Sequence, residues 1–208
     1  MDNSFRSVYT VYAVWNCCHG KLFVYFKCNY TMRRVHLLYT VVIKKERSLM
    51  LNIKVICVGK SKEKYWDAAY AEYLKRLRGY CNPEVIEVKE TKLPANASAA
   101  DERNVIETEG RDIMTKIAAG DYVVALDIQG RELSSEDLAK KISDISFNNS
   151  RISFIIGGSL GLSDEVKKRA DLRFSFGRIT LPHQLARVVL LEQIYRAFKI
   201  NAGEAYHK

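Results

Sequence analysis

The stretch ISFIIGGSLGLSDEV, residues 152–166, indicates the fold class of this protein more clearly than any other part of the chain. It begins with an apolar run typical of a buried strand and ends with Ser163 and two acidic residues, a pattern typical of a helix start. Between the two lie Gly157, Gly158 and Gly161. Glycine adopts positive φ and lets a ligand approach the backbone closely, so we interpret these glycines as a ligand-binding loop. A plain turn between the strand and the helix is the competing interpretation.

Outward from this stretch, apolar runs that predict strands alternate with stretches that predict helices. The expected strands cover residues 51–58, 84–89, 122–128, 152–157 and 172–176. The expected helices cover residues 64–77, 101–118, 162–170 and about 182–200, and another begins at residue 134. Parallel strands need crossover connections, which are usually helices, and these helices cover both faces of the sheet. The order therefore predicts an α/β fold with a mostly parallel sheet and helices on both faces.

The last expected helix carries arginines within an apolar pattern. Pro182 suits its first position, because the missing N–H is not needed there, and His183 follows. Arg187 and Arg196 are nine residues apart, about 2.5 helical turns, so they cannot share one narrow face. A single arginine on a helix is expected to be a solvated surface charge. The face at i, i+3 and i+4 spacing comprises Leu185, Val188, Val189, Glu192, Tyr195 and Phe198, and it forms a stripe that is apolar except for Glu192.

The first strand–turn–helix unit lacks the glycine pattern of a dinucleotide-binding enzyme. It holds only Gly59 where G-x-G-x-x-G is needed, which argues against an ordinary Rossmann enzyme. Lys60, Lys62 and Lys64 cluster at this turn and are either a solvated helix start or a group that meets phosphates. Gly130 follows the third expected strand. It indicates either a ligand-binding site at the carboxyl edge of the sheet or a tight turn.

Residues 1–49 differ in kind from the rest of the chain. They are rich in aromatic residues, poor in acids and without a clear period of 2 or 3.6. Their composition fits a transit peptide or a secretory signal poorly. We expect a non-native or disordered extension over residues 1–49, upstream of a start at Met50, and one domain over residues 50–208. An arm that touches RNA or a membrane is the alternative interpretation.

The charge of the chain indicates a polyanionic partner such as nucleic acid, since 33 Lys and Arg stand against 24 Asp and Glu, a formal net charge of +9. Most of this charge lies in residues 1–49, which hold eight basic residues against Asp2 and Glu46. Residues 50–208 keep 25 basic and 22 acidic residues, a net charge of +3. The charge of residues 50–208 therefore supports binding of free RNA only weakly.

The cysteines argue against both disulfides and metal. The five of them form an odd set without a C-x-x-C pair or zinc-ligand spacing: Cys17, Cys18, Cys28, Cys57 and Cys81. We therefore expect reduced thiols in a cytoplasmic protein and no metal site. No apolar run reaches the roughly 18 residues that a membrane-spanning helix needs, so no membrane is expected as a partner.

Five motifs lie in order, at natural spacing, between about Met50 and Lys208. They are VGKSKEKYW, LDIQGRELSSE, FIIGGSLGL, LPHQLARVVLLEQIYRAF and the terminal GEAYHK. By these motifs the chain resembles the bacterial large-subunit ribosomal RNA methyltransferases that modify N3 of a pseudouridine, which are small enzymes of the SPOUT class. Residues 1–49 have no counterpart in that family.

The resemblance implies a fold, a cofactor and partners. The family has a C-terminal trefoil knot, an exception to the rule that chains avoid knots. Its members use S-adenosylmethionine, act on 23S ribosomal RNA, here expected within the assembled ribosome, and form homodimers in which the partner chain completes each active site. The apolar stripe of the last helix is a suitable dimer surface. By position, the family's cofactor contacts fall on Leu126, Gly157, Phe176, Gly177, Arg178, Ile179, Thr180 and Leu181.

The resemblance and the composition of the tail together indicate four candidate catalytic residues. His207 is the tail side chain whose ordinary pKa lies near neutrality, so it is the candidate base for the N3 proton. Tyr206 is expected to stack on or hydrogen-bond the target base, and Arg196 and Lys208 to hold phosphate or the developing negative charge. A non-enzymatic ribosome- or RNA-binding α/β module is the alternative, and it predicts no binding of S-adenosylmethionine.

Overall fold

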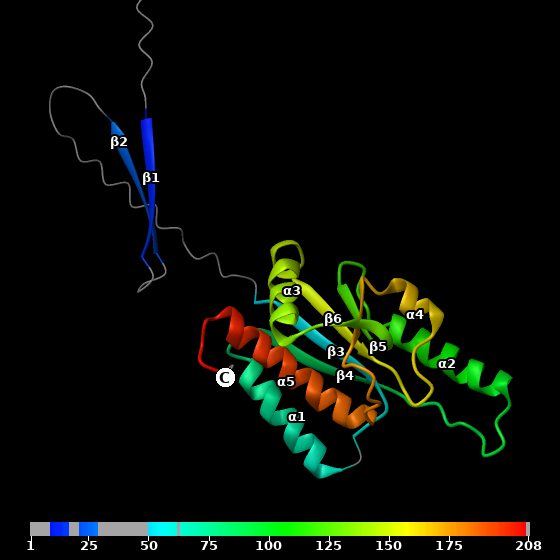
Figure 1. The fold of residues 1–208 in the computed structure, drawn as a ribbon. Helices are drawn as coiled ribbons and strands as arrows, with labels where there is room; N and C mark the ends of the chain where they lie inside the picture. Colours follow the sequence, from blue (N-terminus) through cyan, green and yellow to red (C-terminus); the bar gives the residue numbers. More distant parts are fainter. Residues whose placement is uncertain (1–8, 17–20, 29–49, 62, 207–208) are drawn as a thin grey trace, which may run out of the picture. The chain divides into compact units, whose positions relative to one another are not determined.

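The computed structural model describes residues 9–16, 21–28, 50–61 and 63–206 (Figure 1). The chain divides into two compact units, Met1–Ser48 and Leu49–Lys208. In the first unit, β1 (Tyr9–Asn16) pairs antiparallel with β2 (Lys21–Cys28). The non-native origin or disorder expected for residues 1–49 stays a prediction.

The second unit is built on a five-stranded sheet in the order β4-β3-β6-β5-β7. Every neighbouring pair in this sheet is parallel, which confirms the predicted α/β class. The strands are β3 (Asn52–Val58), β4 (Asn82–Val88), β5 (Tyr122–Glu132), β6 (Arg151–Ile156) and β7 (Leu172–Ser175).

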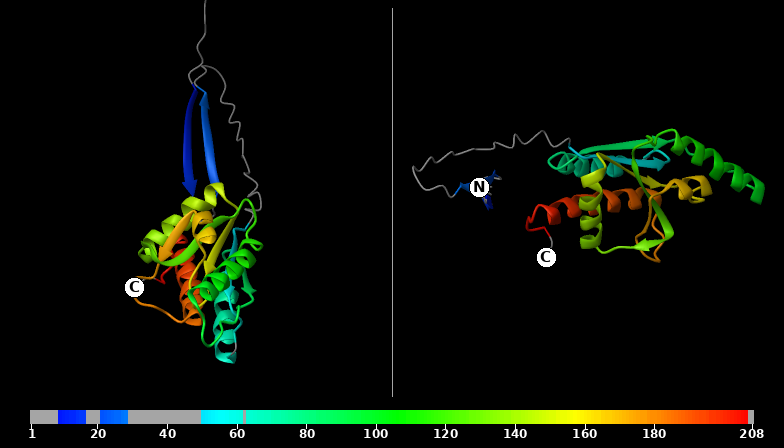
Figure 2. Two further views of the ribbon diagram at one scale, coloured as in Figure 1. Left: turned by 90° about the vertical axis from the view of Figure 1, so that its right-hand side faces the viewer. Right: turned by 90° about the horizontal axis from the view of Figure 1, so that it is seen from above.

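Five helices connect the strands and cover both faces of the sheet. They are α1 (Lys64–Leu77), α2 (Ala99–Met114), α3 (Ser135–Asn148), α4 (Asp164–Arg169) and α5 (His183–Asn201). One core cluster joins the sheet to α1, α3 and α5, and another joins its opposite face to α2 and α4. On its face, α5 packs against both α1 and α3 (Figures 1 and 2). The predicted coverage of both faces is confirmed, whereas the trefoil knot stays a prediction.

Alternation along the strands explains the two layers. In β3, Ile53 and Val55 belong to the core under α1, α3 and α5, and Ile56 and Val58 belong to the core under α2 and α4. Successive side chains of a strand point to opposite faces, so an uninterrupted apolar run is buried on both sides. The helix starts expected at Ser134 and Ser163 also form, because each serine side chain accepts a backbone N–H of the first turn.

The third expected strand is longer than predicted, because β5 continues to Glu132 through a register shift between Leu126 and Arg131. Gly130 thus lies inside the strand and not after it, as its sequence position had suggested. A Cβ atom there would lie 2.7 Å from the backbone carbon of Arg173 and 2.8 Å from the nitrogen of Phe174. Gly130 therefore allows the close approach of β7.

A buried carboxylate joins three segments at the amino ends of the strands. Asp121 is 3% exposed and accepts hydrogen bonds from the Ser153 hydroxyl at 2.8 Å and the Ala118 N–H at 3.1 Å. It also pairs with Lys54 at 3.3 Å and with Arg151 at 2.8 Å. Burial alone would raise the pKa of Asp121, but the bonds from Ser153 and Ala118 and the Lys54 cation outweigh it and lower this pKa.

Replacing Asp121 by asparagine is expected to lower the free energy of unfolding at pH 7 by roughly 2 kcal/mol, because charge-assisted hydrogen bonds are lost. Since folding lowers the pKa of Asp121, its contribution is complete above the unfolded pKa of about 3.9 and disappears as pH falls through the folded value. Urea unfolding at pH 7 and near pH 3 measures this, with the exposed Asp144→Asn as control. An Asp121 deficit as large at pH 3 as at pH 7 would contradict the assignment.

Neither a membrane-spanning helix nor a metal-binding cluster occurs among the described residues. None of the helices in the described ranges is both long and apolar enough to cross a membrane. Within the same ranges, no group of three or more His, Cys, Asp or Glu side chains is placed to hold a metal ion. Cys57 and Cys81 are buried free thiols, and burial raises the pKa of each to about 12.

Candidate functional site

A cavity of about 830 Å³ lies where β6 and β7 end and where β5 shifts its register. Its walls are residues 126–129, 156–162, 174–177 and 179–183, with Lys167 of α4 and Ala186 of α5. Ligands of parallel α/β sheets bind at the carboxyl ends of the strands, and pockets for small molecules typically measure about 300–1,000 Å³. The cavity therefore has both the position and the size of a ligand site.

The glycine-rich loop after β6 forms one wall. Gly157 and Gly161 are packed backbone to backbone, because a Cβ at Gly157 would lie 2.7 Å from the Gly161 carbonyl oxygen. The Gly161 N–H donates to the Gly158 carbonyl at 3.1 Å, and Gly161 has a φ of 88° that only glycine adopts without strain. The two glycine positions are therefore required by a tight turn. Residues 157–161 also line the cavity, so the turn is confirmed while ligand binding by this loop stays a prediction.

A carboxylate of α2 packs behind the same loop. A Cβ at Gly158 would lie 2.7 Å from Glu109 Oε2, and the other oxygen of Glu109 accepts the Thr91 N–H at 2.9 Å. Burial raises the pKa of Glu109. The loop is thus supported from behind by a buried group and leaves no space for a larger residue at position 158.

The segment after β7 forms the opposite wall and is fixed by Ser175. The Ser175 hydroxyl donates to the Ile128 carbonyl at 3.2 Å and accepts the Gly177 N–H at 3.1 Å, so it ties β5 to this segment. Gly177 has a φ of 101°, and a Cβ there would meet nothing within 4 Å. Its backbone is therefore open toward a ligand, while Ile179 is 76% exposed at the rim.

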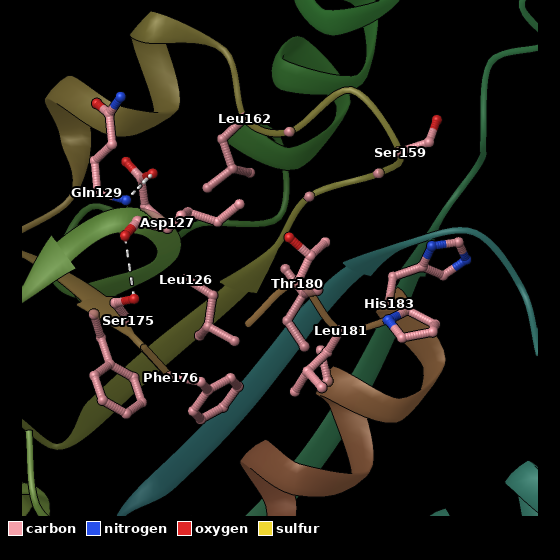
Figure 3. A pocket seen from close by; sticks show the side chains of 18 of the residues that line it. Leu126, Asp127, Gln129, Ser159, Leu162, Ser175, Phe176, Thr180, Leu181 and His183 are labelled. Carbon is pink, nitrogen blue, oxygen red and sulfur yellow. Dashed lines mark hydrogen bonds between the residues drawn. The ribbon is translucent and has the colours of Figure 1, made fainter. Parts of the chain in front are cut away.

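The cavity has an apolar middle between two polar ends (Figure 3). Leu126, Phe176 and Leu181 lie between Asp127 on one side and His183 on the other (Figure 3). Asp127 is held by an ion pair to Arg173 at 2.9 Å and accepts the Gln129 N–H at 3.1 Å. Apolar walls with a few placed polar groups are typical of small-molecule sites.

Seven of the eight positions that the resemblance assigns to the cofactor line this one cavity: Leu126, Gly157, Phe176, Gly177, Ile179, Thr180 and Leu181. Arg178 is exposed and is not among the lining residues. The structure thus gathers residues from three separate segments, although their role in cofactor binding stays a prediction. Sequence reasoning assigned no role here to Ser159, Lys167 or His183. Of these, His183 lies two residues after the end of the expected cofactor run, which was the available signal.

Two of the four candidate catalytic residues, Arg196 and Tyr206, lie together near the end of α5. Arg196 donates to Glu192 Oε1 from Nε at 3.0 Å and from a terminal nitrogen at 2.8 Å, and its guanidinium lies 4.9 Å from the centre of the Tyr206 ring. The hydrogen bonds from Arg196 to Glu192 raise the pKa of Arg196. Tyr206 also meets the Tyr195 ring edge-on, with the ring centres 5.1 Å apart. His207 and Lys208 lie outside the described residues.

This second cluster is far from the cavity within one chain. Arg196 follows His183 by thirteen residues in the same helix, which places it about 20 Å further along the helix axis. Arg196 therefore does not reach the cavity of its own chain in this arrangement.

Arg187 is not the solvated surface charge that its position in a helix had suggested. It is 0% exposed, and it pairs with Glu87 at 2.9 Å and donates to the Gly59 carbonyl at 3.0 Å. The prediction failed because the face of α5 toward α1 also covers the end of β3, which no local pattern reveals. The apolar stripe expected on α5 is likewise only half-buried, and the fully buried positions are Ala186, Leu190, Leu191, Ile194 and Ala197 beside Arg187.

Comparison with known proteins identifies the second unit. A family model described as "Predicted SPOUT methyltransferase" matches residues 51–207. A protein of Ligilactobacillus salivarius named Ribosomal RNA large subunit methyltransferase H is 54% identical over 159 residues, which are 76% of this chain and 100% of that protein. The protein of the same name from Clostridioides difficile is 53% identical over the same shares.

Two solved structures are also similar, at a TM-score of 0.43 each. A probable methylase family protein from Haemophilus influenzae is 11% identical and covers 76% of this chain and 72% of its own. A tRNA (m1G37) methyltransferase from Aquifex aeolicus is 16% identical and covers 71% of this chain and 69% of its own.

Proposed function

The chain belongs to the SPOUT methyltransferase family, and from this premise we propose that it transfers a methyl group from S-adenosylmethionine to N3 of a pseudouridine in 23S ribosomal RNA. The observation that carries the proposal is the match to proteins named as large-subunit ribosomal RNA methyltransferases, which covers 100% of their length. Methyl transfer is the reaction of the family to which the chain belongs. The proposal concerns which RNA is methylated and at which atom.

The cavity suits S-adenosylmethionine. The glycine-rich residues 157–161 line one wall, and Gly177, where a Cβ would meet nothing within 4 Å, lies on the opposite wall. Leu126, Phe176 and Leu181 would flank an adenine ring, and the backbone of residues 177–181 would supply its hydrogen bonds. When bound, the cofactor supplies an electrophilic methyl group on a positively charged sulfur.

The protein's own contribution is to position the acceptor base and to promote removal of its N3 proton. N3 of the target base carries a proton that must leave as the methyl group arrives, so a nearby base or a cation that stabilises the anion accelerates transfer. We assign the cationic role to Arg196, the stacking role to Tyr206, the proton-accepting role to His207 and phosphate binding to Lys208. Arg196 is suited to its role because Glu192 fixes the orientation of its guanidinium while one terminal nitrogen is left for substrate.

The active site is composite, formed by two copies of the chain. The separation of about 20 Å along α5 between His183 and Arg196 supports this assignment, because a partner that packs antiparallel on α5 would bring its Arg196 to the cavity of the first copy. The half-buried apolar residues Leu185, Val188 and Val189 offer the surface for such packing. A homodimer is thus part of the proposed function.

The expected substrate is the assembled ribosome in the cytoplasm. Residues 50–208 carry a net charge of only +3, which is modest for a protein that holds free RNA. A dimer doubles this charge, and a ribosome offers a shaped surface in addition to phosphates.

Mass spectrometry of ribosomal RNA from cells that lack the protein tests the proposal. We expect the loss of one methyl group from one pseudouridine of 23S RNA, restored by a plasmid copy of the gene. An unchanged modification map would refute the proposed substrate. Calorimetry with S-adenosylmethionine separates the enzyme from a non-enzymatic RNA-binding module, because such a module would bind no cofactor.

A further inference from the structure

Arg187 of α5 is charged and yet completely buried, at 0% exposure. Arginine is almost never fully buried unless it is paired, and here its partners come from three different segments. One terminal nitrogen lies 2.9 Å from Glu87 Oε1 of β4, and the other donates to the Gly59 carbonyl at 3.0 Å. The guanidinium also lies 4.9 Å from the ring centre of Tyr70 in α1. Arg187 therefore joins α5 to β4, to α1 and to the turn after β3.

A second side chain of α5 reinforces the same connection. Gln184 accepts the Tyr70 hydroxyl at 2.5 Å and donates from Nε2 to the Lys60 carbonyl at 3.0 Å. The Ser61 N–H donates at 3.1 Å to the same Glu87 oxygen that pairs with the guanidinium. Two side chains of α5, together with Glu87, hold three consecutive residues of the turn after β3, while Nε of Arg187 is buried and has no hydrogen-bond partner among the described residues. We call this set the α5 anchor; it comprises Tyr70, Glu87, Gln184, Arg187 and residues 59–61.

The α5 anchor lies directly behind one wall of the cavity. His183 and Ala186, which alternate with the two anchor side chains on the first turns of α5, line the cavity, as do the preceding Leu181 and Pro182. The N-cap residue of α5 is Pro182, which makes no side-chain capping hydrogen bond. A helix start without a cap has unpaired N–H groups and frays easily. The α5 anchor is therefore the contact that fixes this end of the helix.

We propose that Arg187 is a positioning residue for the transfer reaction. Through the α5 anchor it holds the first turn of α5 against the turn after β3, so that the wall from Leu181 to Ala186 keeps the shape that receives the methyl donor. This inference rests on the proposed use of S-adenosylmethionine. It assigns no contact between Arg187 and the donor.

The test compares Arg187→Lys, Arg187→Met and Gln184→Ala with the wild-type homodimer. For Arg187→Met we expect a higher dissociation constant and a higher KM for S-adenosylmethionine, and a kcat/KM lowered roughly 100-fold, as misplacement of a binding wall by about 1 Å produces. Lysine keeps the charge but not the planar fork, so Arg187→Lys should recover only part of the loss. Gln184→Ala removes the side-chain hydrogen bonds of Gln184 to Tyr70 and Lys60. Because Gln184 is partly exposed, this variant is expected to fold, so it keeps the test decisive if the Arg187 variants fold poorly. Hydrogen exchange of residues 183–187 should quicken in all three.

A matched control distinguishes positioning from general stability. Ser153→Ala removes a hydrogen bond from a completely buried hydroxyl at the opposite end of the sheet, to Asp121. We expect this control to lower the unfolding temperature while leaving cofactor affinity and exchange in residues 183–187 unchanged. The inference is overturned if the affinity for S-adenosylmethionine falls in proportion to the unfolding temperature in the Ser153 variant and in the α5 anchor variants alike. It is also overturned if the α5 anchor variants bind S-adenosylmethionine normally. If the wild type itself binds no S-adenosylmethionine, the proposed function falls, and the inference falls with it.

Discussion

Replacing Arg196 by alanine is expected to lower the rate of methyl transfer by roughly 100- to 1,000-fold, the loss that follows removal of one group that stabilises developing negative charge. The affinity for S-adenosylmethionine should stay unchanged, because Arg196 lies about 20 Å along α5 from the cavity wall of its own chain. Single-turnover kinetics with ribosomes and calorimetry with the cofactor measure the two quantities separately.

Arg76→Ala is the matched control for this variant. Arg76 also pairs with a glutamate four residues earlier, Glu72, at 2.8 Å, and its guanidinium also lies over tyrosine rings. The two arginines therefore have similar local surroundings, and a general loss of surface charge or packing would affect both alike. We expect near-normal transfer from the Arg76 variant. Equal rates for the two variants would remove Arg196 from the reaction.

Replacing Gly157 by alanine is expected to abolish measurable binding of S-adenosylmethionine and, with it, methyl transfer. The new Cβ would lie 2.7 Å from the Gly161 carbonyl oxygen and 3.0 Å from the Leu162 side chain. The oxygen belongs to the backbone of the same tight turn, so the glycine-rich wall must move, and misplacement by about 1 Å costs on the order of 100-fold. Calorimetry measures the loss of affinity, and circular dichroism verifies the fold.

Gly79→Ala provides the control for backbone effects. A Cβ at Gly79 would meet only the Arg76 carbonyl oxygen at 3.7 Å, an ordinary van der Waals distance, so this variant should bind the cofactor normally. Normal binding by the Gly157 variant would show that the glycine turn is only a structural connection, and that the donor binds elsewhere.

Mixing the two inactive variants tests the composite site. In a heterodimer of the Arg196 and Gly157 variants, one site combines an intact cavity with an intact Arg196 from the partner. A 1:1 mixture that exchanges subunits should therefore recover about a quarter of the wild-type sites, as expected for a two-fold symmetric dimer. If each chain carried its own complete site, mixing would restore nothing.

The strand and helix order of residues 50–208 could be predicted because its signals are local. Apolar runs, the serine caps at Ser134 and Ser163 and the glycine-rich turn each depend on a few neighbouring residues. The end of β5 could not be predicted, because Gly130 is required by the backbone of β7, more than forty residues away in the chain. A glycine at position 130 is compatible with a turn, with a ligand site at the edge of the sheet or with the close approach of another strand.

The sequence alone therefore determined the alternating α/β plan, the glycine turn after β6 and, by its motifs, the candidate residues. Only the tertiary structure decided which of them share a site. Glu87 and Arg187 are 100 residues apart in the chain and 2.9 Å apart in space, because the strand order β4-β3-β6-β5-β7 packs α5 over the end of β3. Burial of a charged side chain depends on such distant packing, whereas helix and strand periodicity does not. The same packing places Arg196 about 20 Å along α5 from the cavity wall of its own chain, which supports the proposed composite site.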